Sequence, residues 1–412
     1  MTDAGRDLER SIRGLNWTYA LMGAADATLL PYVPLYLAAR KLDVLQIGVV
    51  LAFAAAGWFV AGLAWAYVAD RTGKPEGAVM GATVAAVVVS LVLPWTSGVV
   101  AVGTVTVLLS VARAPFTMLD PITLQRLRES SRTRYARIRL RMSAGWALSA
   151  VLAGAGYQML GLKFMPFTYA LMVGLVGAWC ARALRPGATR QPVTPAAVAT
   201  RRLPAISTAM LGFTAACLLL GVSTAAAQNF VVLRIDFLGG GALLIGAAAA
   251  FQAVTEIPTM GFTHVLTRRL SHSMLFALGS AIFMAVFLAW ALITNPVALA
   301  LLKFVTGVGF ALTYVAAVLI ADELWPARLR ATGQAVTKSV MFGLAPIAGN
   351  FGGGFVYATY GPSAMFAISA AVVGAAGVAG LLALPAPKPR AQPEPAVTSA
   401  ALPETIPESA GP

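Results

Sequence analysis

Residues 77–94 of the chain have the sequence GAVMGATVAAVVVSLVLP, a stretch without a single charged side chain. A lipid core about 30 Å thick requires about 20 apolar residues in a helix that rises 1.5 Å per residue. Comparable apolar runs recur along the chain, for example at 205–233 and 362–384. Glycine and proline within such runs are compatible with membrane helices, because neighbouring helices satisfy the freed backbone groups. The runs predict an all-α membrane protein.

The composition of the whole chain supports this prediction. Of its 412 residues 58% are hydrophobic and only 11% are charged, and the mean hydropathy is +0.78. A soluble domain carries about 25% charged residues, so most of this exterior must face lipid. The two cysteines, Cys180 and Cys217, lie in or beside apolar runs and predict buried thiols rather than a disulfide framework.

The apolar runs predict about twelve membrane-spanning helices. The first run is too long for a signal-peptide core and has no small-residue cleavage site after it, so we expect it to be retained as a helix. The expected spans are 15–38, 46–69, 77–95, 98–119, 141–161, 164–184, 205–233, 240–263, 273–293, 296–320, 334–358 and 362–384.

The net charge of +14 is distributed in a way that indicates orientation rather than nucleic-acid binding. Lysine and arginine concentrate in the cytoplasmic loops of membrane proteins. With an even number of spans and the N-terminus inside, one side holds only Arg40, Lys41, Lys163 and Arg234. The other side holds Arg6, Arg10, Arg13, Arg71, Lys74, the 126–141 cluster, the arginines of 182–202, Arg268, Arg269, Arg328 and Arg330. Both termini are therefore expected in the cytoplasm.

Three polar stretches, one at each end and one in the middle, delimit the parts of the chain. The expected parts are a cytoplasmic segment 1–14, a six-helix bundle 15–184, a proline-rich cytoplasmic linker 185–204, a second six-helix bundle 205–384 and a disordered cytoplasmic tail 385–412. The two bundles carry similar motifs, RIRLRMSAG at 137–145 and RLRATG at 328–333. Repeated six-helix halves with a central site are typical of secondary transporters.

The loop between the second and third spans, AYVADRTGKP at 66–75, resembles the signature loop of the major facilitator superfamily, whose consensus is G-x-x-x-D-R-x-G-R-K. Ala66 replaces the leading glycine and one basic residue follows Gly73, but the core of Asp70, Arg71 and Gly73 is intact. The resemblance implies a conformational latch at these three residues. The alternative is an ordinary solvated hairpin. The matching loop 263–271 lacks an acidic residue, so any latch is one-sided.

Three further stretches narrow the resemblance: PYVPLYL at 31–37 with QIG at 46–48, the Asp120-to-Trp146 region, and RLRATGQ at 328–334. Together they resemble the branch that holds phenylpropionate permease-like, nucleoside:proton and oligosaccharide:proton symporters, over residues 15–384. This resemblance implies a proton-coupled symporter that works by alternating access.

Ionisable side chains at membrane depth cost about 2.5–3.5 kcal/mol each on insertion scales, so each requires a partner, a cavity or a function. Glu256 is the strongest candidate, because it lies well inside the eighth span and Pro258 predicts a helix break beside it. A carboxylate isolated from water suits a proton carrier, and a matching glutamate of the sugar symporters participates in substrate recognition. A structural ion pair is the alternative.

The resemblance also matches Arg139 to a substrate-binding arginine of the sugar symporters, although Arg139 also belongs to a run of cytoplasmic arginines. Asp120 stands one position from their carboxylate partner, which puts sugar specificity in question. Lys303 matches a lysine of their proton site, but the histidine and glutamate that complete that site are Thr306 and Gly309 here. Proton coupling therefore cannot use that site. Lys303 is expected either to bind an anionic substrate or to pair with a carboxylate.

Asp26 and Arg113 complete the set of membrane-depth charges, and each is expected either to face a cavity or to join two helices. Small residues around Asp26 permit close helix approach. Gln252 and Asn229 are candidate cavity amides, with Gln228 and Asn350 as further possibilities.

The sequence favours a transporter over other classes of membrane protein. It contains no Walker loop, metal-binding spacing or nucleophile motif, so we expect no enzymatic activity, no cofactor apart from a transported proton, and no metal. The expected partners are a small-molecule substrate and lipid, without nucleic acid, and the expected form is a monomer in the bacterial cytoplasmic membrane. The alternatives are proton-driven efflux of drugs or metabolites and a non-transporting receptor on the same scaffold.

Overall fold

The structure is a computed structural model that describes residues 3–72, 75–120, 122–123, 132–183, 207–326 and 329–383. Within these ranges every regular element is a helix, as the sequence predicts. The linker 185–204, the tail 385–412, and Gly73 and Lys74 of the expected latch loop lie outside the described residues.

The first half of the chain forms long helices joined by short turns. They are α1 (Asp3–Leu29), which continues through η1 (Leu30–Tyr32) into α2 (Val33–Ala39), then α3 (Val44–Thr72), α4 (Pro75–Val92), η2 (Leu93–Trp95), α5 (Val99–Arg113), η3 (Ala114–Met118), α7 (Arg132–Leu160), η4 (Leu162–Phe164) and α8 (Met165–Ala183).

The second half follows a similar order. It consists of α9 (Thr208–Phe237), α10 (Gly241–Leu266), α11 (His272–Leu292), α12 (Pro296–Leu301), α13 (Lys303–Leu324), α14 (Arg330–Ser339), the π-helical segment η7 (Val340–Leu344) and α15 (Ala345–Leu382). Arg234 was expected in a loop, but it is buried in the last turn of α9 and donates hydrogen bonds to the carbonyls of Ala291 and Ile293.

Ten segments of the described residues are long and apolar enough to span a membrane. The last of them, Thr332–Leu382, is 51 residues long, but its backbone leaves the helical conformation at Gly361, where φ is 84° and Pro362 follows. Helix α7 is not among the ten, because its charge-free part after Arg141 is rich in glycine, serine and other weakly apolar residues. The structure thus shows a multi-pass membrane protein, while the count of twelve stays a prediction.

Three helices differ from their expected limits. Helix α1 begins at Asp3, before the membrane span expected from residue 15, and α7 begins at Arg132, before the span expected from residue 141, with Arg139 inside it. The break expected at Pro258 does not occur, because α10 continues through this proline to Leu266. A proline is tolerated inside a membrane helix when neighbouring groups satisfy the freed carbonyl.

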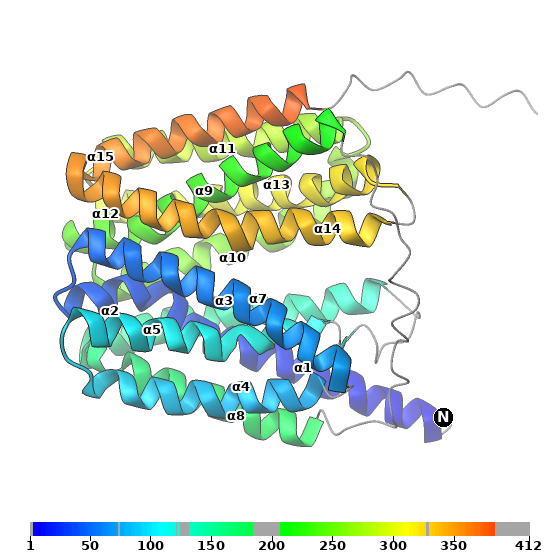
Figure 1. Ribbon diagram of the computed structural model, residues 1–412, viewed down its shortest axis with the longest axis vertical. Coiled ribbons are helices and arrows are strands. Elements are labelled where there is room, and N and C mark those ends of the chain that lie inside the picture. The colour runs from blue at the N-terminus through cyan, green and yellow to red at the C-terminus, as the bar shows by residue number, and fades with distance from the viewer. Residues whose placement is uncertain are drawn as a thin grey trace, which may run out of the picture.

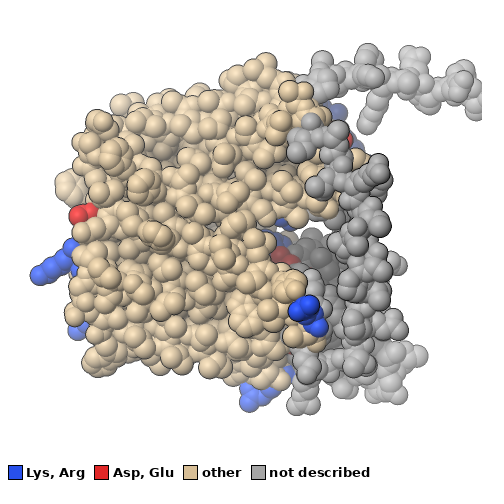
Figure 2. All heavy atoms as spheres, in the orientation of Figure 1, with Lys and Arg blue, Asp and Glu red and all other residues tan. Residues whose placement is uncertain are grey.

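The helices run roughly parallel and form two halves (Figure 1). In that view α1 to α8 make up the lower half and α9 to α15 the upper half, with α7 packed on α10 and α3 on α15 across the boundary. The visible lysine, arginine, aspartate and glutamate side chains gather near the two ends of the helices and leave an apolar belt between them (Figure 2). This is the distribution expected of a protein surrounded by lipid.

The two halves approach closely toward the end of the molecule away from the N-terminus. A β-carbon on Gly48 of α3 would come within 2.8 Å of the Cα atom of Gly354 in α15, and one on Gly154 of α7 within 2.7 Å of the Ala242 carbonyl in α10. Two hydrogen bonds also join the halves here, from Asn350 Nδ2 to the Leu51 carbonyl (3.3 Å) and from the Leu243 amide to Gln158 Oε1 (3.5 Å). We call this set of contacts the closed end.

Candidate functional site

Two neighbouring cavities lie between the halves. The first has a volume of about 570 Å³ and the second about 330 Å³. Leu30, Pro34, Met142 and Asn229 line both, so the cavities share a wall. Pockets for small organic ligands typically measure about 300–1,000 Å³. Ionisable side chains from both halves line this pair of cavities, and all six predicted membrane-depth charges are among them.

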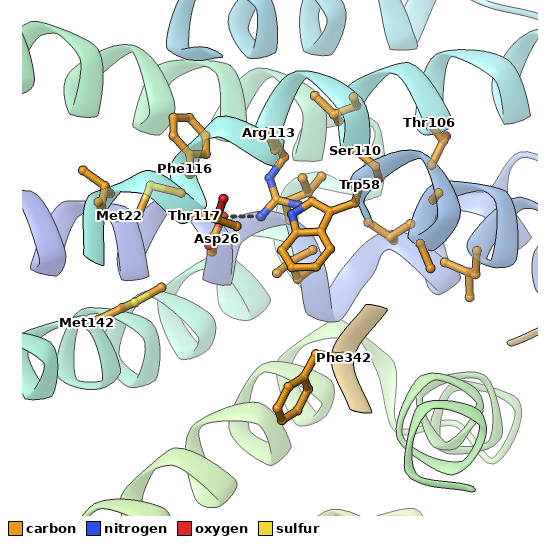
Figure 3. A pocket seen from close by; sticks show the side chains of 18 of the residues that line it. Met22, Asp26, Trp58, Thr106, Ser110, Arg113, Phe116, Thr117, Met142 and Phe342 are labelled. Carbon is orange, nitrogen blue, oxygen red and sulfur yellow. Dashed lines mark hydrogen bonds and ion pairs between the residues drawn. The ribbon is translucent and has the colours of Figure 1, made fainter. Parts of the chain in front are cut away.

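Asp26 of α1 and Arg113 of α5 form an ion pair in the wall of the first cavity, with Arg113 Nη2 donating to Asp26 Oδ1 (Figure 3). Each side chain is only 10% exposed. The guanidinium carbon also lies 5.7 Å from the ring centre of Tyr169. The expectation that these residues either face a cavity or join helices is met on both counts. A buried pair of this kind is costly to break, because either partner alone is an uncompensated charge.

Asp120 and Arg139 form a second ion pair, with 2.7 Å between Arg139 Nη1 and Asp120 Oδ2. Tyr19 Oη donates to the other carboxylate oxygen at 2.6 Å. The side chains of Arg139 and Asp120 are 50% and 39% exposed, and both line the first cavity. Arg139 therefore lies at the cavity as well as within the run of arginines. Asp120 is its partner, even though it stands one position from the carboxylate of the sugar symporters.

Lys303 begins α13 and lies in the wall of the second cavity with 8% exposure. Its ammonium donates to Gln228 Oε1 and, at 3.0 Å, to Gln252 Oε1, and it lies 5.8 Å from the Trp290 ring centre. No carboxylate of the described residues forms an ion pair with it. Its partners are thus neutral amides.

Glu256 lines the second cavity, one turn after Gln252 on the same face of α10. The part of the chain that the structure describes provides no ion pair or hydrogen bond for this carboxylate, and the charge that acts on it is the guanidinium of Arg139. The alternative prediction for Glu256, a structural ion pair, is not seen.

Asn229 connects the cavities to the closed end. Its Nδ2 atom donates to Asn350 Oδ1 at 2.7 Å, and Asn350 in turn donates to the Leu51 carbonyl of the other half. Asn350 is 3% exposed, so both of its amide atoms have partners inside the protein. The side chain of Asn229 is therefore hydrogen-bonded directly to a residue of the closed end.

The two residues that replace the sugar-symporter proton site take no part in the cavity lining. Thr306 is buried and donates to the Lys303 carbonyl at 2.8 Å. Gly309 faces α11, where a β-carbon would meet Ile282 and the Gly279 carbonyl at 3.2 and 3.3 Å. Both positions serve helix packing.

The latch residues are only partly visible. Asp70 and Arg71 lie in the last turn of α3, and the Asp70 side chain and Gly73 are outside the described set. Arg71 is exposed, with its guanidinium 5.4 Å from the ring centre of Tyr67. The latch interpretation stays a prediction.

The sequence did not show which aromatic residues line the cavities. Trp58, Phe116 and Phe342 line the first cavity and Trp146 the second. Figure 3 shows Trp58 beside the Arg113 guanidinium and Phe342 on the opposite side of the cavity. Aromatic residues inside apolar runs carry no signal that separates cavity lining from lipid contact. Among the described residues no cluster of histidine, cysteine, aspartate and glutamate has the geometry of a metal site.

Comparisons with known proteins agree with this arrangement. The family model described as "MFS_1 like family" matches residues 12–368. A maltose permease of Geobacillus stearothermophilus is 29% identical over 332 residues, which cover 79% of this chain and 82% of the permease.

Among solved structures, a variant of the nucleoside transporter NupG superimposes with a TM-score of 0.77 at 15% identity, covering 91% of this chain and 100% of that one. A peptide transporter POT in complex with sulfate gives a TM-score of 0.72 at 16% identity, covering 91% and 93%. At these identities the two structures establish the fold alone.

Proposed function

This chain belongs to the MFS_1 like family, and we propose that it is a proton-coupled symporter that moves a small organic solute across the bacterial cytoplasmic membrane by alternating access. The observation that carries the proposal is the pair of cavities between the halves, lined by six ionisable side chains and bounded by the closed end. A site at the interface of two halves is reached from alternate sides when the halves rock against each other.

We propose that the chain spans the membrane twelve times as two six-helix bundles, 15–184 and 205–384, with both termini in the cytoplasm. Two observations support a count above ten. A 51-residue helix would measure roughly 75 Å, and the last candidate span has that number of residues and turns at Gly361. Helix α7 has 29 residues and packs between α1 and α10.

The first cavity extends toward the end that carries the N-terminus. Of its lining residues, Asp120 follows η3 after the end of α5, and Arg139 lies in the first third of α7. Basic and acidic side chains are visible there at a hollow between the halves (Figure 2). With the N-terminus in the cytoplasm, the structure represents the state whose site faces inward. The loop with Asp70, Arg71 and Gly73 would serve as a latch on this same side, and one copy of the chain would suffice for transport.

Glu256 is the proposed proton carrier. It is the cavity carboxylate for which the described residues provide no ion pair, whereas Asp26 and Asp120 are each paired with an arginine. Protonation of a paired carboxylate would leave its arginine uncompensated, and protonation of Glu256 carries no such cost.

The test is uptake into proteoliposomes with and without an imposed pH gradient, with aromatic acids, nucleosides and disaccharides as trial substrates. We expect a gradient to drive accumulation of one class. Glu256→Gln should abolish this accumulation and still allow exchange of labelled for unlabelled substrate. Flux that is unchanged by every gradient would refute proton symport, and accumulation by the Gln variant would refute the assignment of Glu256.

A further inference from the structure

The charges that line the two cavities are only partly neutralised by ion pairs. The described residues that line them carry three carboxylates and three cations, namely Asp26, Asp120, Glu256, Arg113, Arg139 and Lys303. Four of these six charges cancel in two ion pairs. Lys303 and Glu256 are left, each in the second cavity and without an ion-pair partner in the described part of the chain.

The hydrogen-bond partners of Lys303 among the described residues are two neutral amides, which do not neutralise its charge. A buried ammonium is stable when a negative charge lies beside it, and two amide oxygens supply only partial charges. Gln228 and Gln252 hold the ammonium at the cavity wall from two helices, α9 and α10, which fixes its position without neutralising it. A substrate anion that entered the second cavity would supply the missing charge.

Glu256 sets the condition under which this anion enters. With Glu256 ionised, the lining has no net charge, and an added anion would bring it to −1. With Glu256 protonated, the lining carries +1, and an added monoanion returns it to zero. Charges inside a low-dielectric site interact strongly, so the neutral combinations are favoured.

We propose that the substrate is an organic monoanion whose acidic group binds Lys303, and that it crosses together with one proton in an electroneutral step. The proposal rests on the proposed function, since it takes Glu256 as the proton carrier. The second cavity, of about 330 Å³ with Trp146 in its wall, accommodates a ring-sized body beside the acidic group. The empty carrier and the carrier loaded with proton and anion then have the same charge as they cross.

The binding test uses matched pairs of probes that differ in charge and little in shape: benzoate with benzamide, and benzenesulfonate with benzenesulfonamide. Binding is measured on the purified full chain by ligand-dependent shift of its thermal unfolding. We expect at least one anion to bind and its amide to bind much more weakly. Lys303→Gln should weaken anion binding by about 10- to 100-fold, the effect of one charge-assisted hydrogen bond. Equal binding of an amide, unchanged binding by the variant, or binding of neither anion would overturn the proposal.

The transport test separates this proposal from the proposed function. Benzenesulfonate stays ionised and does not cross lipid as a neutral acid, which removes the background that benzoate gives. Uptake is compared under a pH gradient with the membrane potential clamped at zero and under a potential without a pH gradient. We expect accumulation in the first case and none in the second. Accumulation in both would contradict an electroneutral step. Binding without accumulation in either case would refute proton symport and leave the anion site standing.

Discussion

The two halves of the molecule share the packing contacts between their helices, which we call the shared frame, and differ in the charged side chains that line the cavities. Matching glycines pack at matching places: Gly14 against Ala183 and Gly212 against Ala383, Gly177 against Thr83 and Gly377 against Ser280. Near the end away from the N-terminus, Arg40 donates to the carbonyls of Pro94 and Thr96, as Arg234 donates to those of Ala291 and Ile293. These packing contacts between helices are thus present twice.

The charged side chains of the cavities are not duplicated in this way. The cavity charges of the first half occur as two ion pairs, Asp26 with Arg113 and Asp120 with Arg139. Those of the second half, Glu256 and Lys303, have no ion pairs among the described residues. The packing contacts are therefore common to both halves, whereas the cavity charges that have no ion pair among the described residues belong to the second half.

The largest expected effect comes from breaking the buried pair. Asp26→Asn leaves Arg113 as an uncompensated buried charge, so we expect a loss of about 3–5 kcal/mol in the free energy of unfolding. The measurement is unfolding in mixed micelles titrated with a denaturing detergent. The double variant Asp26→Asn with Arg113→Gln should recover part of the loss. A stable single variant would show that the first half does not depend on its pair.

The shared frame is tested by placing one methyl group at matching positions. Gly177→Ala and Gly377→Ala introduce β-carbons 2.6 Å from Thr83 Oγ1 and 2.9 Å from Ser280 Cβ. Each should cost about 1–3 kcal/mol in the same unfolding assay. Gly174→Ala, on the same helix as Gly177, is the control, since its β-carbon would lie 3.8 Å from its nearest neighbour. Markedly unequal losses at the two positions would contradict a shared frame.

The second half should respond differently when its buried charge is removed. Lys303→Gln eliminates a charge that has no counter-ion, so we expect the free energy of unfolding to change by less than about 1 kcal/mol or to rise. The variant should nevertheless lose binding of the anion probes. A loss of stability as large as that of Asp26→Asn would indicate that Lys303 belongs to an ion pair, and the contrast between the halves would fail.

The smallest effect is expected at the more exposed pair. Asp120→Asn should cost about 0–1 kcal/mol, because solvent already screens an ion pair whose members are 39% and 50% exposed. The same assay at high salt, which screens the wild-type pair as well, should narrow the difference between the two proteins. A cost above that of the glycine variants would place this pair in the same class as Asp26 and Arg113.

The sequence predicted the helical membrane fold and all six cavity charges, because charged residues stand out inside apolar runs. It could not predict how the charges combine. Asp26 and Arg113 are far apart in sequence, and only the packing of α1 against neighbouring helices brings them together. Pro258 predicted a break that α10 does not have, and α7 begins at Arg132, before the membrane span expected at 141–161, because arginines end the apolar pattern there. The aromatic lining had no distinguishing pattern at all.

The closed end has a consequence for leakage of protons. Where Gly48 meets Gly354, main chain lies against main chain, and neither residue has a side chain to rotate. Side-chain rotations open gaps within nanoseconds, whereas separation of whole helices takes microseconds to milliseconds. At this one contact of the closed end, a file of water molecules along which protons could hop is therefore expected only when the two helices separate. A cell that keeps many idle copies of this carrier in its membrane should lose little of its proton gradient through them.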